Sequence, residues 1–73
     1  MSDTQDSDAV TIRRTIRQTI RDADDPPRRT ALVELVSTRT GAPATAVRDE
    51  LDACERHGFV YLVGDDDPEV KLP

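Results

Sequence analysis

Helix-ending signals divide this chain of 73 residues into segments that fit only a small domain. Three short stretches have the apolar spacing of a helix. They are followed in turn by a proline pair at 26–27, by Gly41 and by Gly58. Proline cannot continue a helix, and glycine readily takes the left-handed conformation that ends one, so three short helices are predicted. Their expected ranges are from near Asp8 to residue 23, about 27–39 and about 43–57.

Each predicted helix has one apolar face. The first contains a four-residue repeat in which Ile12, Ile16 and Ile20 form the inward row. Val10 and Val33 fall at the margins of the buried faces of their helices. The predicted core consists of Ile16, Ile20, Leu32, Leu35, Val36, Val47, Leu51 and Phe59.

The end of the chain is typical of a β-hairpin. Residues 59–63 are rich in β formers, residues 64–68 form an acidic turn, and residues 69–72 alternate between polar and apolar. The predicted fold class is therefore α+β, with three helices followed by a two-stranded hairpin. This domain is expected over 8–73, after a disordered acidic tail over 1–7.

The stretch from Thr30 to Pro43 resembles the first helix and turn of a helix-turn-helix motif, and Ala44 to Val60 is similar to the second helix running into a wing. This order resembles the winged helix-turn-helix superfamily, which includes MarR-type, ArsR-type and many small archaeal regulators. The resemblance implies a DNA-binding transcriptional regulator whose third helix enters the major groove. It implies DNA contacts by Arg39, Ala44, Thr45, Arg48 and Arg56.

The distribution of charged residues is compatible with a second function. The chain carries 15 acidic and 10 basic residues, and Asp49, Asp52 and the 65–67 run place carboxylates on the outer face of the third helix and on the wing. The alternative is therefore a protein-interaction module on a winged-helix scaffold that does not bind DNA.

A basic row runs beside the isoleucines of the first helix. Arg13, Arg17 and Arg21 recur every four residues. They are candidates to hold a DNA backbone or an acidic partner helix. The other interpretation is a solvated face whose arginine stems cover part of the isoleucine row.

The types of charged residue indicate the salt concentration to which the chain is suited. Nine of the ten basic residues are arginine, and eleven of the fifteen acidic residues are aspartate. This composition resembles proteins of organisms with molar salt inside the cell. At about 1 M salt the Debye length is only about 3 Å, so net charge says little about partners.

The sequence offers few residues that could form a metal site or a catalytic site. Cys54 and His57 are the only cysteine and histidine, and a structural zinc site needs four ligands, so no metal site is expected and Cys54 is predicted to be a core residue. The aspartates at 65–67 fit a solvated turn, with weak Mg²⁺ or Ca²⁺ binding as the alternative. Without a catalytic constellation or a phosphate loop, no enzyme activity and no cofactor are predicted.

The distribution of apolar residues predicts where the chain is located and which partners it has. No stretch approaches the roughly 20 apolar residues of a membrane span, and no secretory signal begins the chain, so a cytoplasmic location is expected. Within 59–63, Phe59, Tyr61 and Val63 share one face, opposite Val60 and Leu62. This surplus of apolar surface predicts a homodimer through the first helix or the hairpin.

Overall fold

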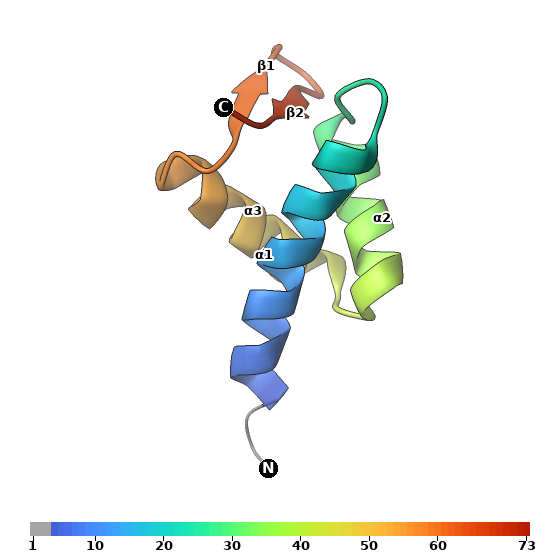
Figure 1. The fold of residues 1–73 in the computed structure, drawn as a ribbon, viewed down its shortest axis with the longest axis vertical. Coiled ribbons are helices and arrows are strands. Elements are labelled where there is room, and N and C mark those ends of the chain that lie inside the picture. The colour runs from blue at the N-terminus through green and yellow to red at the C-terminus, as the bar shows by residue number, and fades with distance from the viewer. Residues whose placement is uncertain (1–3) are drawn as a thin grey trace.

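Three helices precede a two-stranded hairpin in the computed structural model, which describes the backbone of residues 4–73 and the side chains of residues 9–73. This order confirms the predicted α+β layout, and Figure 1 shows the hairpin at the end of the molecule opposite the N-terminus. The elements are α1 (Thr4–Asp22), α2 (Arg29–Thr40), α3 (Ala44–Arg56), β1 (Tyr61–Val63) and β2 (Glu69–Lys71).

Helix α1 begins four residues earlier than predicted, at Thr4. The tail expected over 1–7 is therefore helical from that residue on, and its first three residues lie outside the described part of the chain. The inward row is as predicted, because Ile12, Ile16 and Ile20 are 2%, 0% and 8% exposed. Isoleucine is a mediocre helix former, so this burial is what stabilises the helix.

Helix α2 buries a different set of residues from the predicted one. Leu32, Val33 and Val36 are buried, whereas Leu35 is 45% exposed. The prediction of Leu35 as a core residue is wrong, and Val33 takes its place. Helix α2 packs against both α1 and α3, so two neighbours together determine which sector of it is covered.

Two glycines end helices as predicted. Gly41 follows α2 with φ at 77°, and its N–H donates to the Ser37 carbonyl at 2.8 Å. Pro43 then stands directly before α3, whose inward residues Val47, Leu51 and Cys54 are all buried as predicted. Gly58 has φ at 81°, and the left-handed turn it makes directs the chain from α3 toward the hairpin.

The hairpin is antiparallel and buries one face. Its register pairs Leu62 with Val70 at the centre, and Val70 is fully buried. Phe59 is 47% exposed, so its predicted place in the core is wrong. The chain alternates from Phe59 onward, and the inward face is the one that begins with Val60.

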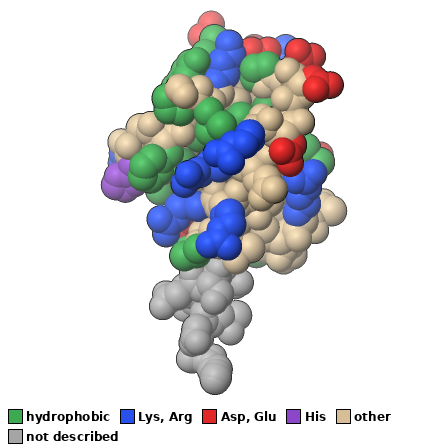
Figure 2. All heavy atoms as spheres, viewed as in Figure 1, with side chains coloured by type: hydrophobic (Ala, Val, Ile, Leu, Met, Phe, Trp, Pro, Cys, Tyr) green, Lys and Arg blue, Asp and Glu red, His purple; other side chains and the backbone are tan. Residues whose placement is uncertain are grey.

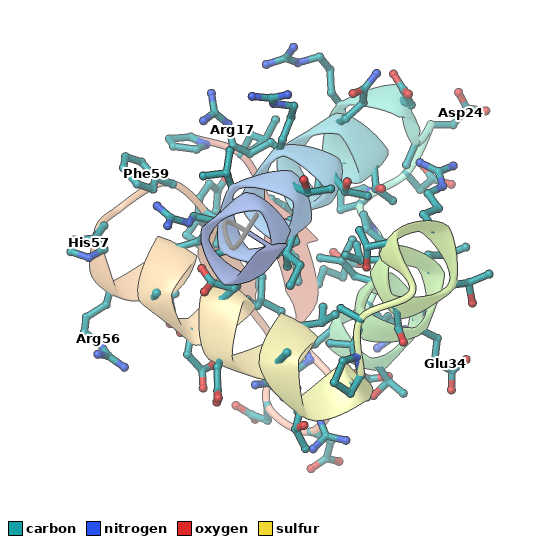
Figure 3. The ribbon with its side chains drawn as sticks, turned by 90° about the horizontal axis from the view of Figure 1, so that it is seen from below. Arg17, Asp24, Glu34, Arg56, His57 and Phe59 are labelled. Carbon is teal, nitrogen blue, oxygen red and sulfur yellow. The ribbon has the colours of Figure 1, made fainter. Side chains whose placement is uncertain are left out.

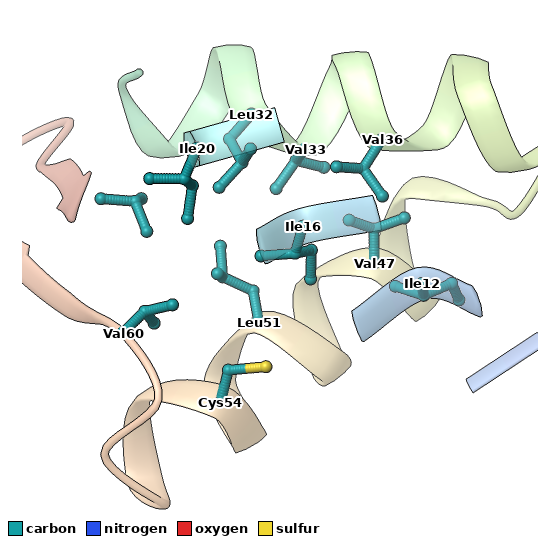
Figure 4. Close-up of a cluster of buried hydrophobic side chains, with 11 residues drawn as sticks. Ile12, Ile16, Ile20, Leu32, Val33, Val36, Val47, Leu51, Cys54 and Val60 are labelled. Carbon is teal, nitrogen blue, oxygen red and sulfur yellow. The ribbon is translucent and has the colours of Figure 1, made fainter. Parts of the chain in front are cut away.

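One core joins all the elements. Figure 4 shows the close-up of these buried side chains, in which Ile16, Leu51 and Val47 lie between the helices. The buried cluster consists of Ile12, Ile16, Ile20, Leu32, Val33, Val36, Val47, Leu51, Cys54, Val60 and Val70. Among the described residues, no helix has the length and apolar character needed to cross a membrane.

Candidate functional site

The first half of α3 gathers three of the residues predicted to contact DNA. Thr45 and Arg48 are exposed three residues apart, which places them on one side of the helix, and Ala44 beside them is half-buried. Arg56 is exposed at the other end of α3, about 12 Å further along the axis. The structure therefore brings together the predicted base-reading residues and separates them from Arg56.

Arg39 lies elsewhere. Its Nη1 donates a hydrogen bond to Oγ1 of Thr19 at 3.1 Å, so its guanidinium group connects the end of α2 with α1. Thr19 is almost fully buried, and a buried hydroxyl needs such a partner. Arg39 has an architectural contact that the sequence did not predict.

Two carboxylates of α3 are held by arginines from other helices. Arg13 Nε lies 3.0 Å from Glu50 Oε1, and Arg29 Nη2 lies 3.0 Å from Asp52 Oδ1. Pairs as exposed as these contribute about 0–1 kcal/mol to stability. Their main effect is on charge, because they neutralise Glu50 and also Asp52, which sequence analysis assigned to the outer face of this helix, and leave Asp49 exposed.

Hydrogen bonds connect the hairpin loop to the start of α2. Asp67 Oδ1 accepts hydrogen bonds from the backbone N–H of Thr30 at 3.0 Å and from its hydroxyl at 2.9 Å. The backbone hydrogen bond is the main reason that the pKa of Asp67 is lowered, and the Thr30 hydroxyl adds to it. One of the three aspartates in the loop is thus a helix cap, while Asp65 and Asp66 are exposed.

A groove of about 400 Å³ runs along α1 where it meets the end of α3. Figure 2 shows basic side chains gathered over α1 on this face, next to apolar ones. We call this feature the arginine groove; its lining residues are Val10, Arg13, Arg14, Arg17, Gln18, Arg21, Cys54 and Phe59.

The predicted row Arg13, Arg17 and Arg21 lines the arginine groove. Figure 3, which looks along α1, shows Arg17 and Phe59 on the same side of the molecule, with Arg56 pointing away. Phe59, which the core prediction wrongly placed in the core, is exposed on this surface. Its signal was present in the alternation of residues 59–63, which already placed it on the face opposite Val60.

Cys54 closes the floor of the groove as a buried thiol, which confirms its prediction as a core residue. Burial raises its pKa, although the charge of nearby Arg13 acts in the opposite direction. The His57 ring lies beside Phe59 with centroids 6.0 Å apart. Within the described residues, no three His, Cys, Asp or Glu side chains come together as metal ligands would.

Comparisons of the chain with protein-family models, curated proteins and solved structures found no match.

Proposed function

We propose that the chain is a small winged-helix DNA-binding protein that regulates transcription, with α3 as the helix that enters the major groove. The observation that carries this proposal is the exposed first half of α3. There Thr45 and Arg48 face solvent, and the carboxylates of Glu50 and Asp52, further along α3, are paired with arginines of other helices. This arrangement offers a donor-rich end of a helix to a groove lined by base edges.

The hairpin supports the winged-helix assignment. It is antiparallel, it follows α3 directly, and it stays beside the start of α2. The Val70 N–H donates to the Pro27 carbonyl at 2.8 Å, and Arg28 forms a single antiparallel bridge with Glu69. A wing held in this way has a fixed position relative to the helix pair.

Each DNA-contacting residue has a chemical role in the proposal. Arg48 has the bidentate geometry that suits guanine, and Thr45 and Ala44 are small enough to let the helix approach the bases. Arg56 contacts a phosphate further along the backbone. Arg39 is exposed and uses one N–H to bind Thr19, so its remaining N–H donors supply the phosphate contact assigned to it.

The alternative is a protein-interaction module without DNA binding. It is favoured by the exposed carboxylates of Asp49, Asp65 and Asp66, which would repel a phosphate backbone. The exposed apolar face of the hairpin, with Tyr61 and Val63, also suits a protein partner.

Selection from a pool of random-sequence DNA duplexes decides between the two functions. It should be run in about 1 M KCl, where counterion release drives binding less and base contacts contribute more. We expect an enriched sequence that binds in fluorescence anisotropy. If the folded chain enriches no sequence and binds no duplex, DNA binding is rejected and the interaction module becomes the better description.

Substitutions on α3 then test the assigned surface. Arg48→Ala should weaken binding to the enriched sequence about tenfold or more, as the loss of one good base contact does. Asp49→Asn should strengthen it, because a negative charge beside the phosphates is removed. Glu34→Gln, the same type of change on the exposed side of α2, should leave binding unchanged.

A further inference from the structure

The first helix carries opposite charges in its two halves. Within α1, residues 4–8 contain two aspartates and no basic residue, whereas residues 13–21 contain four arginines, followed by Asp22 as the last residue of the helix. Helix α1 is continuous from residue 4 to residue 22, a length of about 28 Å. The molecule therefore presents a rod that is acidic toward one end and basic toward the other.

The acidic half of this rod reaches beyond the rest of the fold. Helix α1 has 19 residues, against 12 in α2 and 13 in α3. Figure 1 shows its N-terminal turns extending past the ends of both other helices. Val10, near the point where α1 leaves the body, is 48% exposed. The backbone of α1 therefore extends beyond α2 and α3 at this end.

The arginine groove follows a single face of α1. Its α1 members stand at positions 10, 13, 14, 17, 18 and 21, spaced three and four residues apart as neighbours on one side of a helix are. Position 6, four residues before Val10, continues the same spacing and is an aspartate. Among the described side chains, no carboxylate lies within ion-pair distance of Arg14, Arg17 or Arg21.

We propose that the arginine groove receives α1 of a second copy of this chain, running antiparallel to the first. In that arrangement the acidic turns of each copy lie along the arginines of the other, and the contact occurs twice around a two-fold axis. Val10 and Phe59, both about half exposed, become covered in the same contact. The interface is thus apolar at its floor, with an Asp6–Arg17 contact of opposite charges on each side of the axis.

Spacing along the chain fixes the register. When Asp6 of one copy is opposite Arg17 of the other, the two-fold axis passes between residues 11 and 12 of both helices. Positions 10 and 13 then face each other across the axis. The reverse, parallel arrangement places aspartates against aspartates and arginines against arginines, which is repulsive.

Charge complementarity is the reason for choosing a second copy as the occupant. The groove requires a helix with carboxylates at intervals of one turn beside an apolar residue. The start of the chain's own α1 supplies a carboxylate one turn before an apolar residue, because Asp6 is followed four residues later by exposed Val10. The dimer does not depend on DNA binding, so its test is separate from that of the proposed function.

Sedimentation equilibrium of the full chain tests the dimer. In about 0.2 M KCl, where charges still act over several ångströms, we expect a species of twice the 8.1 kDa chain mass. Arg17→Asp and Asp6→Arg should each weaken dimerisation about tenfold or more, because each one creates a like-charge contact twice. Combining both substitutions restores opposite charges and should return most of the affinity.

A second set of variants controls for the change in net charge. Asp66→Arg changes an exposed aspartate of the hairpin loop and should leave dimerisation unchanged. Combined with Arg17→Asp, it gives the same overall charge as the restoring pair and should not restore affinity. Circular dichroism establishes that each variant is folded. Should Arg17→Asp fail to fold, Asp6→Arg tests the contact alone, because it changes none of the described core residues.

Four results would overturn the proposal. A folded wild-type chain that stays at 8.1 kDa at about 100 µM has no such dimer. A dimer that is indifferent to both charge reversals uses another surface, of which the exposed hairpin face is the first candidate. Loss without restoration by the Asp6→Arg and Arg17→Asp pair rejects the antiparallel register. Tight binding of an acidic helical peptide to a monomeric wild-type chain would identify a different occupant.

Discussion

Asp67 caps a helix that begins 38 residues before it in the sequence. Its Oδ1 accepts hydrogen bonds from both the backbone N–H and the hydroxyl of Thr30, in the first turn of α2. The residue at the usual capping position, Arg28, makes no side-chain cap; its Nη1 donates instead to the Asp67 carbonyl at 3.0 Å. The hairpin loop thus supplies the acceptor that the first turn of α2 would otherwise lack.

Replacing this cap should destabilise the fold. Asp67→Ala leaves the Thr30 N–H without its side-chain acceptor, so the midpoint of urea unfolding should fall. Thr30→Ala should cost less, because the backbone hydrogen bond survives. Asp66→Ala removes an equal charge from an exposed neighbour and serves as the control. Equal effects of Asp67→Ala and Asp66→Ala would show that the loop is not fastened through this carboxylate.

The same carboxylate makes stability depend on acid pH. Hydrogen bonds from Thr30 hold the folded-state pKa of Asp67 below its ordinary value of 3.8. Its contribution is therefore present above that ordinary pKa and is lost as pH falls through the lower folded-state pKa. In urea titrations across the acid range, Asp67→Asn should show a shallower loss of stability than wild type. Identical slopes would contradict this role.

Helix positions were predictable because local spacing and glycine stops determine them, but the buried sector of α2 was not. Five of the six residues from 31 to 36 are apolar, so the pattern alone could not separate Val33 from Leu35. Contacts with α1 and α3 determine that Val33 is buried and Leu35 is exposed. The strand at 59–63 was ambiguous for the same reason, since both of its faces are apolar.

Charge pairing was the other part that the sequence could not give. The partners in Arg13–Glu50, Arg29–Asp52 and Thr30–Asp67 are separated by more than 20 residues, and no local pattern links them. Without the two arginine–carboxylate pairs the surface of α3 looked more acidic than it is, and without the Thr30 contact Asp67 looked like the other two loop aspartates. The candidate DNA surface therefore depended on contacts that only the fold brings together.

A pair of leucines tests which faces are buried. Leu51→Ala should cost about 2–5 kcal/mol, because it empties part of a core position that is 1% exposed. Leu35→Ala should cost less than about 1 kcal/mol, because Leu35 is 45% exposed and alanine favours helix. Chemical unfolding measures both. A larger loss for Leu35→Ala than for Leu51→Ala would mean that the helices face the other way.

The turn between α2 and α3 depends on the conformation of Gly41. No atom lies within 4 Å of the position that a Cβ would occupy, so substitution meets no clash. The cost of Gly41→Ala is then the strain of φ at 77°, about 1–2 kcal/mol. Gly41→Asn should cost less, because asparagine tolerates this conformation better. If both variants match wild type in unfolding measurements, the left-handed turn is not required.

Salt should stabilise the chain. The net charge is −5, and exposed aspartates in the 23–28 turn and the hairpin loop repel one another at low ionic strength. The Debye length falls from about 10 Å at 0.1 M to less than about 3 Å at 2 M, so the Tm should be higher in 2 M than in 0.1 M KCl. Measurement at about 1 µM chain keeps self-association from contributing. The variant Asp65→Asn with Asp66→Asn should gain less from salt than wild type. A Tm that is flat or falls with KCl would show that charge repulsion does not limit the stability of this fold.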